Sequence, residues 1–162
     1  MVKSDDRRDA ILDQLADHVL THGLVASSLR PLAKAAGLSD RMLLYYFKDK
    51  GALIEATLDR IVTRLTTRLT AQVGSELLPL DRLATKLLDI LLADDLWPYM
   101  CVWLEIAALA ARGDTFYRKT GGQIGAGFLA WGAAQLDNPQ DATALLVRIE
   151  GTLLLHGLGM AT

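Results

Sequence analysis

Helical periodicity is the feature that most limits the folds open to this chain. Apolar residues recur at spacings of one, three and four along almost its whole length, and no segment alternates strictly between apolar and polar residues. The pattern therefore predicts an all-α protein. In residues 6–22 it forms a single stripe of Ile11, Leu12, Leu15, Ala16, Val19 and Leu20.

Glycines and capping residues divide this pattern into helices. Gly23 ends the first, Ser27 and Ser28 offer caps to a second that closes at Gly37, and Ser39 is expected to cap a third. Helix, glycine-containing turn and helix together are typical of a DNA-reading hairpin. Further helices are predicted over about 50–73, 81–93, 97–112, 114–135 and 140–158.

The long helix over 50–73 is expected to connect a three-helix head to a second helical bundle. The helical pattern is interrupted at 74–79, which is the candidate boundary between the head with its connecting helix and the second bundle. By role, we predict a helix-turn-helix domain in residues 1–50. Residues 51–162 are predicted to form the connecting helix and a ligand-binding and dimerisation domain.

The apolar content raises the question of what covers so much hydrophobic surface. The sequence is 51% hydrophobic with a mean hydropathy of +0.24. The apolar stretch from Leu96 to Ala111, interrupted by Glu105, is shorter than the roughly 18 to 20 residues of a membrane span. A subunit interface is therefore favoured over a membrane. The charged N-terminus and the single cysteine, Cys101, favour a cytoplasmic protein.

The net charge of −2 lacks the basic excess of a dedicated nucleic-acid protein. Residues 1–60 hold nine Lys or Arg and nine Asp or Glu. DNA affinity would then depend on where the cations lie.

The predicted third helix has an outer face that is unusual for a solvent surface. Leu43 and Phe47 share its inner face, which leaves Arg41, Met42, Tyr45 and Tyr46 outside. Arginine can pair with guanine, apolar atoms can meet thymine methyls, and tyrosine hydroxyls can reach phosphates. The alternative is an amphipathic helix whose tyrosines shield the core.

Residues 28–58 resemble the tetracycline-repressor-like (TetR/AcrR) family of transcription regulators. The likeness extends over about the first 60 residues, and beyond them only to the layout of helices. It runs through Ser28-Leu29-Arg30, Leu32-Ala33-Lys34-Ala35-Ala36-Gly37-Leu38-Ser39, Leu43, Tyr45, Phe47, Lys50 and Ala52-Leu53.

The resemblance implies that the third helix enters the major groove, that Ser28 and Arg30 touch the DNA backbone, and that Lys50 meets a phosphate. A lysine at a helix N-terminus is also a physically reasonable anion site. Leu44 replaces a frequent aromatic residue and Tyr46 a frequent His or Asn. These departures leave the operator sequence open, but the expected mode of binding is unchanged. The predicted DNA-binding set is Ser28, Arg30, Ser39, Arg41, Met42, Tyr45, Tyr46 and Lys50.

Aromatic residues in the second half suggest a ligand pocket between two helices, with ordinary bundle core as the alternative. The resemblance implies such a chamber, for an unknown apolar or amphipathic effector. The expected lining is Trp97, Met100, Trp103, Leu104, Phe128 and Trp131. The last helix is too apolar to face water. In the family the corresponding helices form a dimer interface, for which we expect Leu145, Leu146, Ile149, Leu153 and Leu154.

Other chemical motifs are weak. Gly125-Ala126-Gly127-Phe128-Leu129-Ala130 matches a dinucleotide fingerprint by letters only, because no strand precedes it, and its small residues are interpreted as a close helix contact. His18 and His22 are spaced like metal ligands but lack a third ligand, and a packing role is expected for Cys101. We predict no metal, no cofactor and no enzyme activity.

These observations lead to one main hypothesis. We expect a ligand-responsive regulator, a repressor, that binds a palindromic operator in double-stranded DNA as a homodimer. The alternative is a dimeric helical protein that binds a small molecule and whose DNA-reading head is weak or non-functional.

Overall fold

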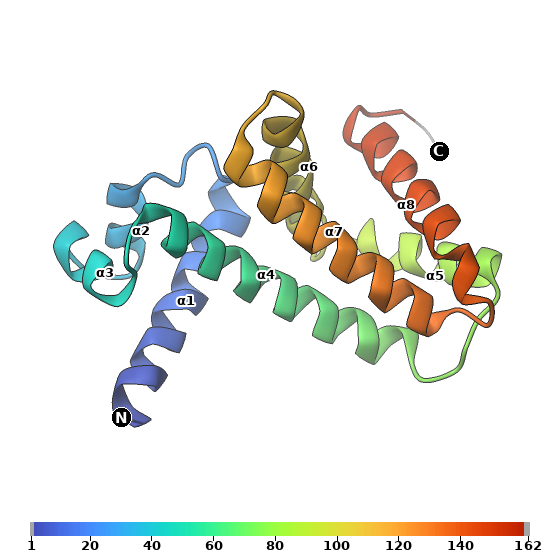
Figure 1. The fold of residues 1–162 in the computed structure, drawn as a ribbon, viewed down its shortest axis with the longest axis horizontal. Helices are drawn as coiled ribbons and strands as arrows, with labels where there is room; N and C mark the ends of the chain where they lie inside the picture. Colours follow the sequence, from blue (N-terminus) through green and yellow to red (C-terminus); the bar gives the residue numbers. More distant parts are fainter. Residues whose placement is uncertain (1, 161–162) are drawn as a thin grey trace. The chain divides into compact units, whose positions relative to one another are not determined.

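The computed structural model describes residues 2–160, with side chains from Asp6 onward. In this part of the chain the secondary structure consists of helices without strands, which confirms the all-α prediction (Figure 1). The elements are α1 (Val2–His22), α2 (Leu29–Ala35), α3 (Asp40–Tyr46), α4 (Lys50–Val73), α5 (Leu80–Leu91), α6 (Trp97–Ala111), α7 (Thr115–Gln135), the 3₁₀ turn η1 (Pro139–Asp141) and α8 (Ala142–Gly157).

The turn between α2 and α3 is built as the sequence predicted, but the start of α2 is not. Gly37 has a φ of +64°, a backbone conformation that glycine adopts readily. Ser39 caps α3 by accepting a hydrogen bond from the Met42 N–H at 3.2 Å. Ser28 makes no side-chain cap bond to α2. The hydroxyl of Ser27 is buried instead and donates to the Gly23 carbonyl at 2.5 Å, so it fastens the preceding loop.

The chain divides into two compact units between Arg64 and Leu65, within α4. The helix-turn-helix belongs to the first unit and helices α5 to α8 belong to the second. One continuous helix thus contributes residues to both units. The functional bounds expected from the sequence, 1–50 and 51–162, stay a prediction.

The first unit has a core of aliphatic side chains contributed by all four of its helices. Leu15, Leu32, Leu43 and Leu53 are almost fully buried there. Each such leucine stabilises the fold by roughly 1.5 to 3 kcal/mol relative to an exposed one. Because these four come from α1, α2, α3 and α4 in turn, the core fixes α3 against the other helices.

Salt bridges join α1 to α4 along the edge of this core. Arg64 binds Asp13 and Asp17, each at 2.7 Å, and Arg60 binds Asp9 at 2.6 Å. Burial alone would lower the pKa of Arg64, but the hydrogen bonds with Asp17 and Asp13 outweigh it and raise that pKa. The arginines of this stretch of α4 are therefore occupied by carboxylates.

In the second unit, helices α6, α7 and α8 pack on one another, and α8 also packs on α5 (Figure 1). Glycines of α7 permit two close contacts. A Cβ at Gly121 would lie 2.9 Å from Ile106 Cγ2, and one at Gly132 would lie 3.2 Å from Leu145 Cδ2. None of the helices in the described chain combines the length and apolar character needed to cross a bilayer.

Candidate functional site

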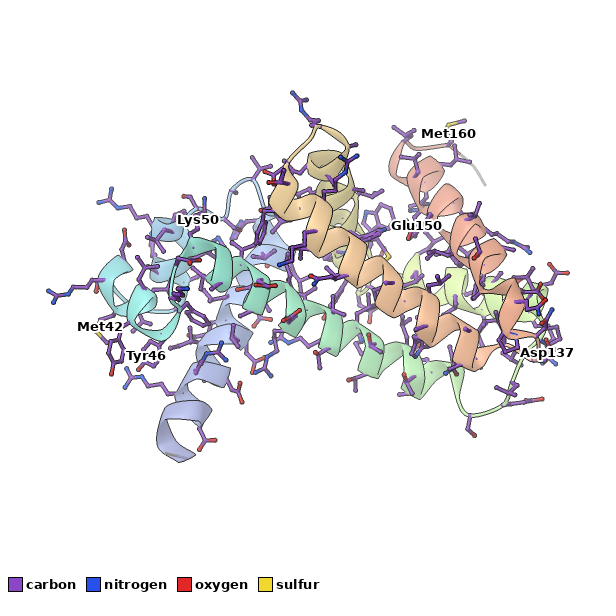
Figure 2. All side chains as sticks on the ribbon, in the orientation of Figure 1. Met42, Tyr46, Lys50, Asp137, Glu150 and Met160 are labelled. Carbon is purple, nitrogen blue, oxygen red and sulfur yellow. The ribbon has the colours of Figure 1, made fainter. Side chains whose placement is uncertain are left out.

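The outer face of α3 is the first candidate site. Leu43 and Phe47 are buried, as predicted, and Tyr45 lies on the opposite side with 80% of its surface exposed. Met42 is also exposed, while Tyr46 is half-buried and meets Tyr45 edge to face, with ring centroids 5.7 Å apart (Figure 2). On the inner side, the Arg8 guanidinium carbon lies over the Phe47 ring, 4.9 Å from the ring centroid. Packing therefore holds α3 by its inner face and leaves the outer face open.

The remaining predicted DNA-binding residues lie around this helix in the same unit. Ser28, Arg30, Ser39, Arg41 and Lys50 are all exposed. Ser28 and Arg30 stand at the start of α2, Ser39 and Arg41 at the start of α3, and Lys50 at the start of α4. The structure therefore leaves every residue of the predicted set, apart from the half-buried Tyr46, accessible to a partner.

The exposed cations around α3 differ from the arginines of α4, because they form no ion pair with a carboxylate of the described residues. Among the described residues, no ion pair involves the exposed side chains of Arg30, Lys34, Arg41, Lys48 or Lys50. By contrast, Arg60, Arg64 and Arg68 of α4 are each paired with an aspartate. The head has a balanced total charge, but residues 28–50, which include α2 and α3, hold five Lys or Arg against two acids, Asp40 and Asp49.

Asp49 is a residue of this region that sequence reasoning missed. Its Oδ1 accepts a hydrogen bond from the Ala52 N–H at 2.8 Å and so caps α4. This carboxylate occupies part of the helix end where a phosphate was expected and lies next to Lys50. An aspartate directly before a long helix is a recognisable cap signal, so the sequence did contain the clue.

Comparison with known proteins identifies this arrangement. Residues 11–57, which cover the end of α1 through the start of α4, match the family described as bacterial regulatory proteins, tetR family. The helix-turn-helix head therefore matches that family. Over 59 residues it is 34% identical to the HTH-type transcriptional regulator BetI of Klebsiella pneumoniae (strain 342), and the match spans 36% of this chain and 30% of that protein.

Solved structures extend the likeness of fold to nearly the whole chain. A Rhodococcus sp. protein assigned to the TetR family superposes with a TM-score of 0.77 at 22% identity, over 98% of this chain and 90% of that one. A TetR-family regulator from Cytophaga hutchinsonii gives 0.75 at 20% identity, over 98% and 86%. The multidrug binding protein EbrR, complexed with imidazole, gives 0.65 at 25% identity, over 91% and 82%. The second unit thus has the fold of TetR-family regulators.

Of the predicted ligand-binding residues of the second unit, Trp97, Trp103 and Leu104 border α8, whereas Trp131 borders α4. Trp97 lies edge-on to His156 of α8, with ring centroids 4.6 Å apart, and Trp103 donates a hydrogen bond to Glu150 of α8 at 2.7 Å. Trp131 instead bonds through Nε1 to the Thr70 hydroxyl of α4 at 3.0 Å. Leu104 also borders α8, at Gly157, whereas Met100 is buried and Phe128 is half-buried.

Glu150 is the ionisable group that the sequence reading passed over in this unit. It is half-buried among the helices of the second unit (Figure 2). Burial raises the pKa of the Glu150 carboxyl, while the hydrogen bond from Trp103 opposes that shift. A lone acid in an otherwise apolar helix was the signal that could have found it.

The residues predicted to form a dimer interface lie on two different faces of α8. Leu145, Ile149 and Leu153 are buried inside the chain itself, and Leu146 is half-buried. Packing on the chain's own helices therefore explains their apolar character, so three of the five residues expected at the dimer interface are covered within the chain. Only Leu154 of the predicted set is exposed. It lies with other exposed apolar residues of the same helix and its end, namely Val147, Leu155, Leu158 and Met160.

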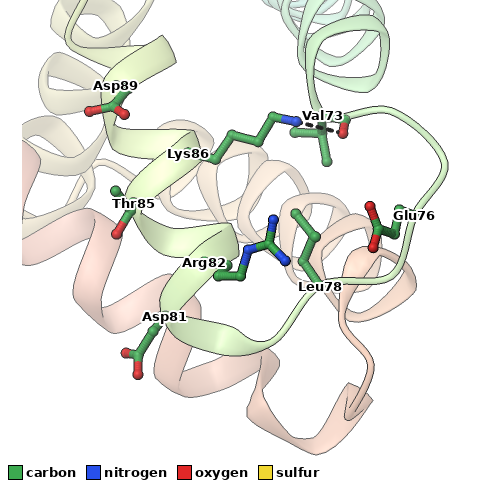
Figure 3. A pocket seen from close by; sticks show the side chains of 8 residues that line it. All are labelled: Val73, Glu76, Leu78, Asp81, Arg82, Thr85, Lys86 and Asp89. Atoms are coloured by element: carbon green, nitrogen blue, oxygen red, sulfur yellow. Dashed lines mark hydrogen bonds between the residues drawn. The ribbon is translucent and has the colours of Figure 1, made fainter.

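An open groove of about 500 Å³ runs between the end of α4 and α5 (Figure 3). The Lys86 ammonium crosses it and donates a hydrogen bond to the Val73 carbonyl at 2.9 Å. The groove contains none of the residues predicted to bind a ligand. Its lining is Val73, Glu76, Leu78, Asp81, Arg82, Thr85, Lys86 and Asp89.

The weaker motifs have structural explanations. The rings of His18 and His22 lie 4.5 Å apart with a 48° tilt between their planes, and burial, together with the neighbouring His22, lowers the pKa of His18. Within the described chain no three His, Cys, Asp or Glu side chains cluster as metal ligands do. Cys101 is exposed, contrary to the expected packing role. The glycines of the fingerprint-like segment lie inside α7, and its close helix contacts occur at Gly121 and Gly132 instead.

Proposed function

We propose that this chain is a ligand-responsive transcriptional repressor that binds a palindromic operator as a homodimer. The observation that carries the proposal is the outer face of α3, where Tyr45 is exposed near cations that form no ion pair with any carboxylate of the described residues. A buried inner face and an open, positively flanked outer face are what a recognition helix requires, because base edges and phosphates must reach the same surface.

Two exposed helix faces in the second unit support dimerisation. On α8, Val147, Leu154 and Leu158 recur at spacings of seven and four and remain in solvent. On α7 the exposed residues at every fourth position are small, namely Gly122, Ala126, Ala130 and Ala134. An apolar helix and a small-residue helix together offer a surface that a second copy can cover by twofold symmetry.

An effector site is proposed near the Trp103–Glu150 pair. Two indole rings, Trp97 and Trp103, and a half-buried carboxylate lie at the contact between α6 and α8. Aromatic faces and an acid favour an amphipathic molecule that carries a positive charge. The description of EbrR as a multidrug binding protein agrees with a ligand site in this fold.

DNA binding is tested with duplexes selected by the protein from a randomised library. Fluorescence anisotropy at rising salt should show sequence-specific binding that weakens steeply, because each phosphate contact releases counterions. Lys50→Ala should weaken binding to all duplexes and lower the salt slope by about 1 for each chain bound. Arg112→Ala removes the same charge from the loop after α6 and should leave the slope unchanged.

Selection of no sequence at all would overturn the proposal. If the protein nevertheless remained a dimer that bound a small molecule, the alternative of a helical binding protein with a non-functional head would be favoured. The balanced charge of residues 1–60 and the Asp49 cap beside Lys50 are the features on which that alternative depends.

A further inference from the structure

Two large apolar side chains on α3 keep part of their surface in solvent, although the inner face of the helix does not need them for its core. Met42 is 42% exposed and Leu44 is 36% exposed. The inner face is already supplied by Leu43 and Phe47, which are 0% and 2% exposed. A helix face adapted only to water would carry polar groups at these positions. Met42 and Leu44 are therefore available to an apolar partner.

The two side chains lie on opposite sides of Tyr45. At about 100° per residue, Tyr45 points away from the midpoint between Leu43 and Phe47. Met42 then lies about 60° to one side of Tyr45 and Leu44 about 100° to the other. A surface that meets Tyr45 end-on would contact Met42 and Leu44 along its two flanks, at different positions.

The surroundings of this face indicate a polyanion as the partner. Arg41 on α3 and Lys48 and Lys50 just after it are exposed, and the described chain holds no carboxylate paired with them. An apolar protein surface or a lipid tail would leave these cations without compensation. Double-stranded DNA offers both requirements together, since phosphates flank a groove whose floor carries hydrocarbon groups at some bases.

On the major-groove edge of unmodified DNA, the hydrocarbon group is the C5-methyl of thymine. Leucine has no donor or acceptor, so Leu44 can distinguish bases there only through that methyl. We propose that Leu44 and Met42 are specificity residues that read thymine methyl groups at two separate positions of each operator half-site. This inference rests on the DNA-binding function proposed above, and it names the chemistry by which that site selects its sequence.

The test compares thymine with deoxyuridine, which lacks only the methyl. The best duplex selected from a randomised library is remade with each thymine replaced in turn, symmetrically in both half-sites, and the Kd of the full-length protein is measured by anisotropy. Loss of a buried methyl contact in both half-sites should weaken binding by about fifteenfold at the contacted positions and leave the others unchanged. Leu44→Ala should abolish the thymine preference at one position and Met42→Ala at another.

Leu77→Ala is the matched control, because Leu77 is an exposed leucine of the second unit, and it should keep both preferences. Sequence-specific binding without sensitivity to deoxyuridine at any position would overturn the inference while leaving the regulator function intact. A preference that persists in a variant would overturn the assignment of that residue. Failure to select any sequence would instead count against the proposed function itself.

Discussion

At the scale of single residues, α3 has buried side chains that pack it against the other helices and exposed side chains that can contact DNA. Leu43 is fully buried, yet two positions later Tyr45 leaves 80% of its surface in solvent. Its ring is not part of the hydrophobic core, so its removal should cost the fold little. Tyr45 is therefore the residue at which function and stability separate most cleanly.

Tyr45→Ala should weaken specific DNA binding strongly while leaving the thermal midpoint nearly unchanged. A contact at a base edge contributes about 1 to 3 kcal/mol, and both subunits of a dimer lose it at once. The measurement is anisotropy on the selected duplex, with circular dichroism melting as the check on folding. Unchanged affinity in a folded variant would contradict the assignment of α3 as the recognition helix.

Helical periodicity predicted that Leu43 and Phe47 lie inside and that Met42 and Tyr45 lie outside. It did not predict that Tyr46 is half-buried or that Leu44 is exposed. The capping groups were less predictable. Ser27 and Ser28 both offered a cap for α2, but the buried Ser27 hydroxyl bonds the Gly23 carbonyl and Ser28 makes no side-chain cap bond. Which of two adjacent serines turns inward depends on the path of the loop, and composition does not encode that path.

At the scale of elements, the bounds of the helices followed from local signals. The fourth helix was expected over about 50–73 and extends over Lys50–Val73, because Asp49 caps its start and Gly74, with a φ of +84°, follows its end. The contacts between helices did not follow in the same way. Small residues in α7 predicted a close approach, but not that Gly121 and Gly132 would provide it.

Gly121→Ala should destabilise the protein even though alanine favours helix. The new methyl would lie 2.9 Å from Ile106 Cγ2, whose branch at Cβ leaves it little freedom to move. Overpacking of this kind costs about 1 to 3 kcal/mol, more than the gain of roughly 0.5 to 1 kcal/mol from helix propensity. Urea unfolding measures the difference.

Gly127→Ala is the matched control on the same helix, because a Cβ there meets nothing within 4 Å. It should stabilise the protein by the propensity term alone. Equal effects of the two substitutions would show that the contact between α6 and α7 tolerates the extra methyl.

At the scale of the whole molecule, periodicity could not tell which apolar faces pack within one chain and which meet another. The apolar last helix was interpreted as a single interface. Its residues divide instead into an inner face with Leu153 and an outer face with Leu154, and these neighbours in sequence have exposures of 1% and 52%. This difference depends on how α5 and α7 pack against α8, and that packing is set by contacts between residues far apart in the sequence.

Leu153 and Leu154 therefore provide a matched pair of substitutions that tests the proposed interface. Leu154→Arg should give a folded monomer, because it places a charge on the exposed face proposed to bind the second copy. Leu153→Arg should prevent folding, because an unpaired charge in the interior is strongly unfavourable. Sedimentation velocity and circular dichroism distinguish these outcomes. A wild-type protein that sediments as a monomer, or a dimer that survives Leu154→Arg, would contradict the proposed interface.

We expect an effector response to pass between the two units through α4, because this helix contributes residues to both. All three tryptophans, Trp97, Trp103 and Trp131, lie in the second unit, so indole fluorescence reports on that unit. We expect an amphipathic cation such as tetraphenylphosphonium to quench this fluorescence and to weaken binding to the selected duplex. Trp103→Phe, which removes the hydrogen bond to Glu150 and keeps an aromatic ring, should weaken both effects together.

The two effects must share one coupling free energy, because a ligand alters DNA affinity only by binding the two conformations unequally. A tenfold loss of operator affinity corresponds to about 1.4 kcal/mol, and saturating DNA should weaken the cation by the same factor. Titration of the cation with and without the duplex measures that factor directly. Quenching that is unaffected by DNA would make the second unit a binding module without a switch, and quenching that persists in Trp103→Phe would place the ligand elsewhere.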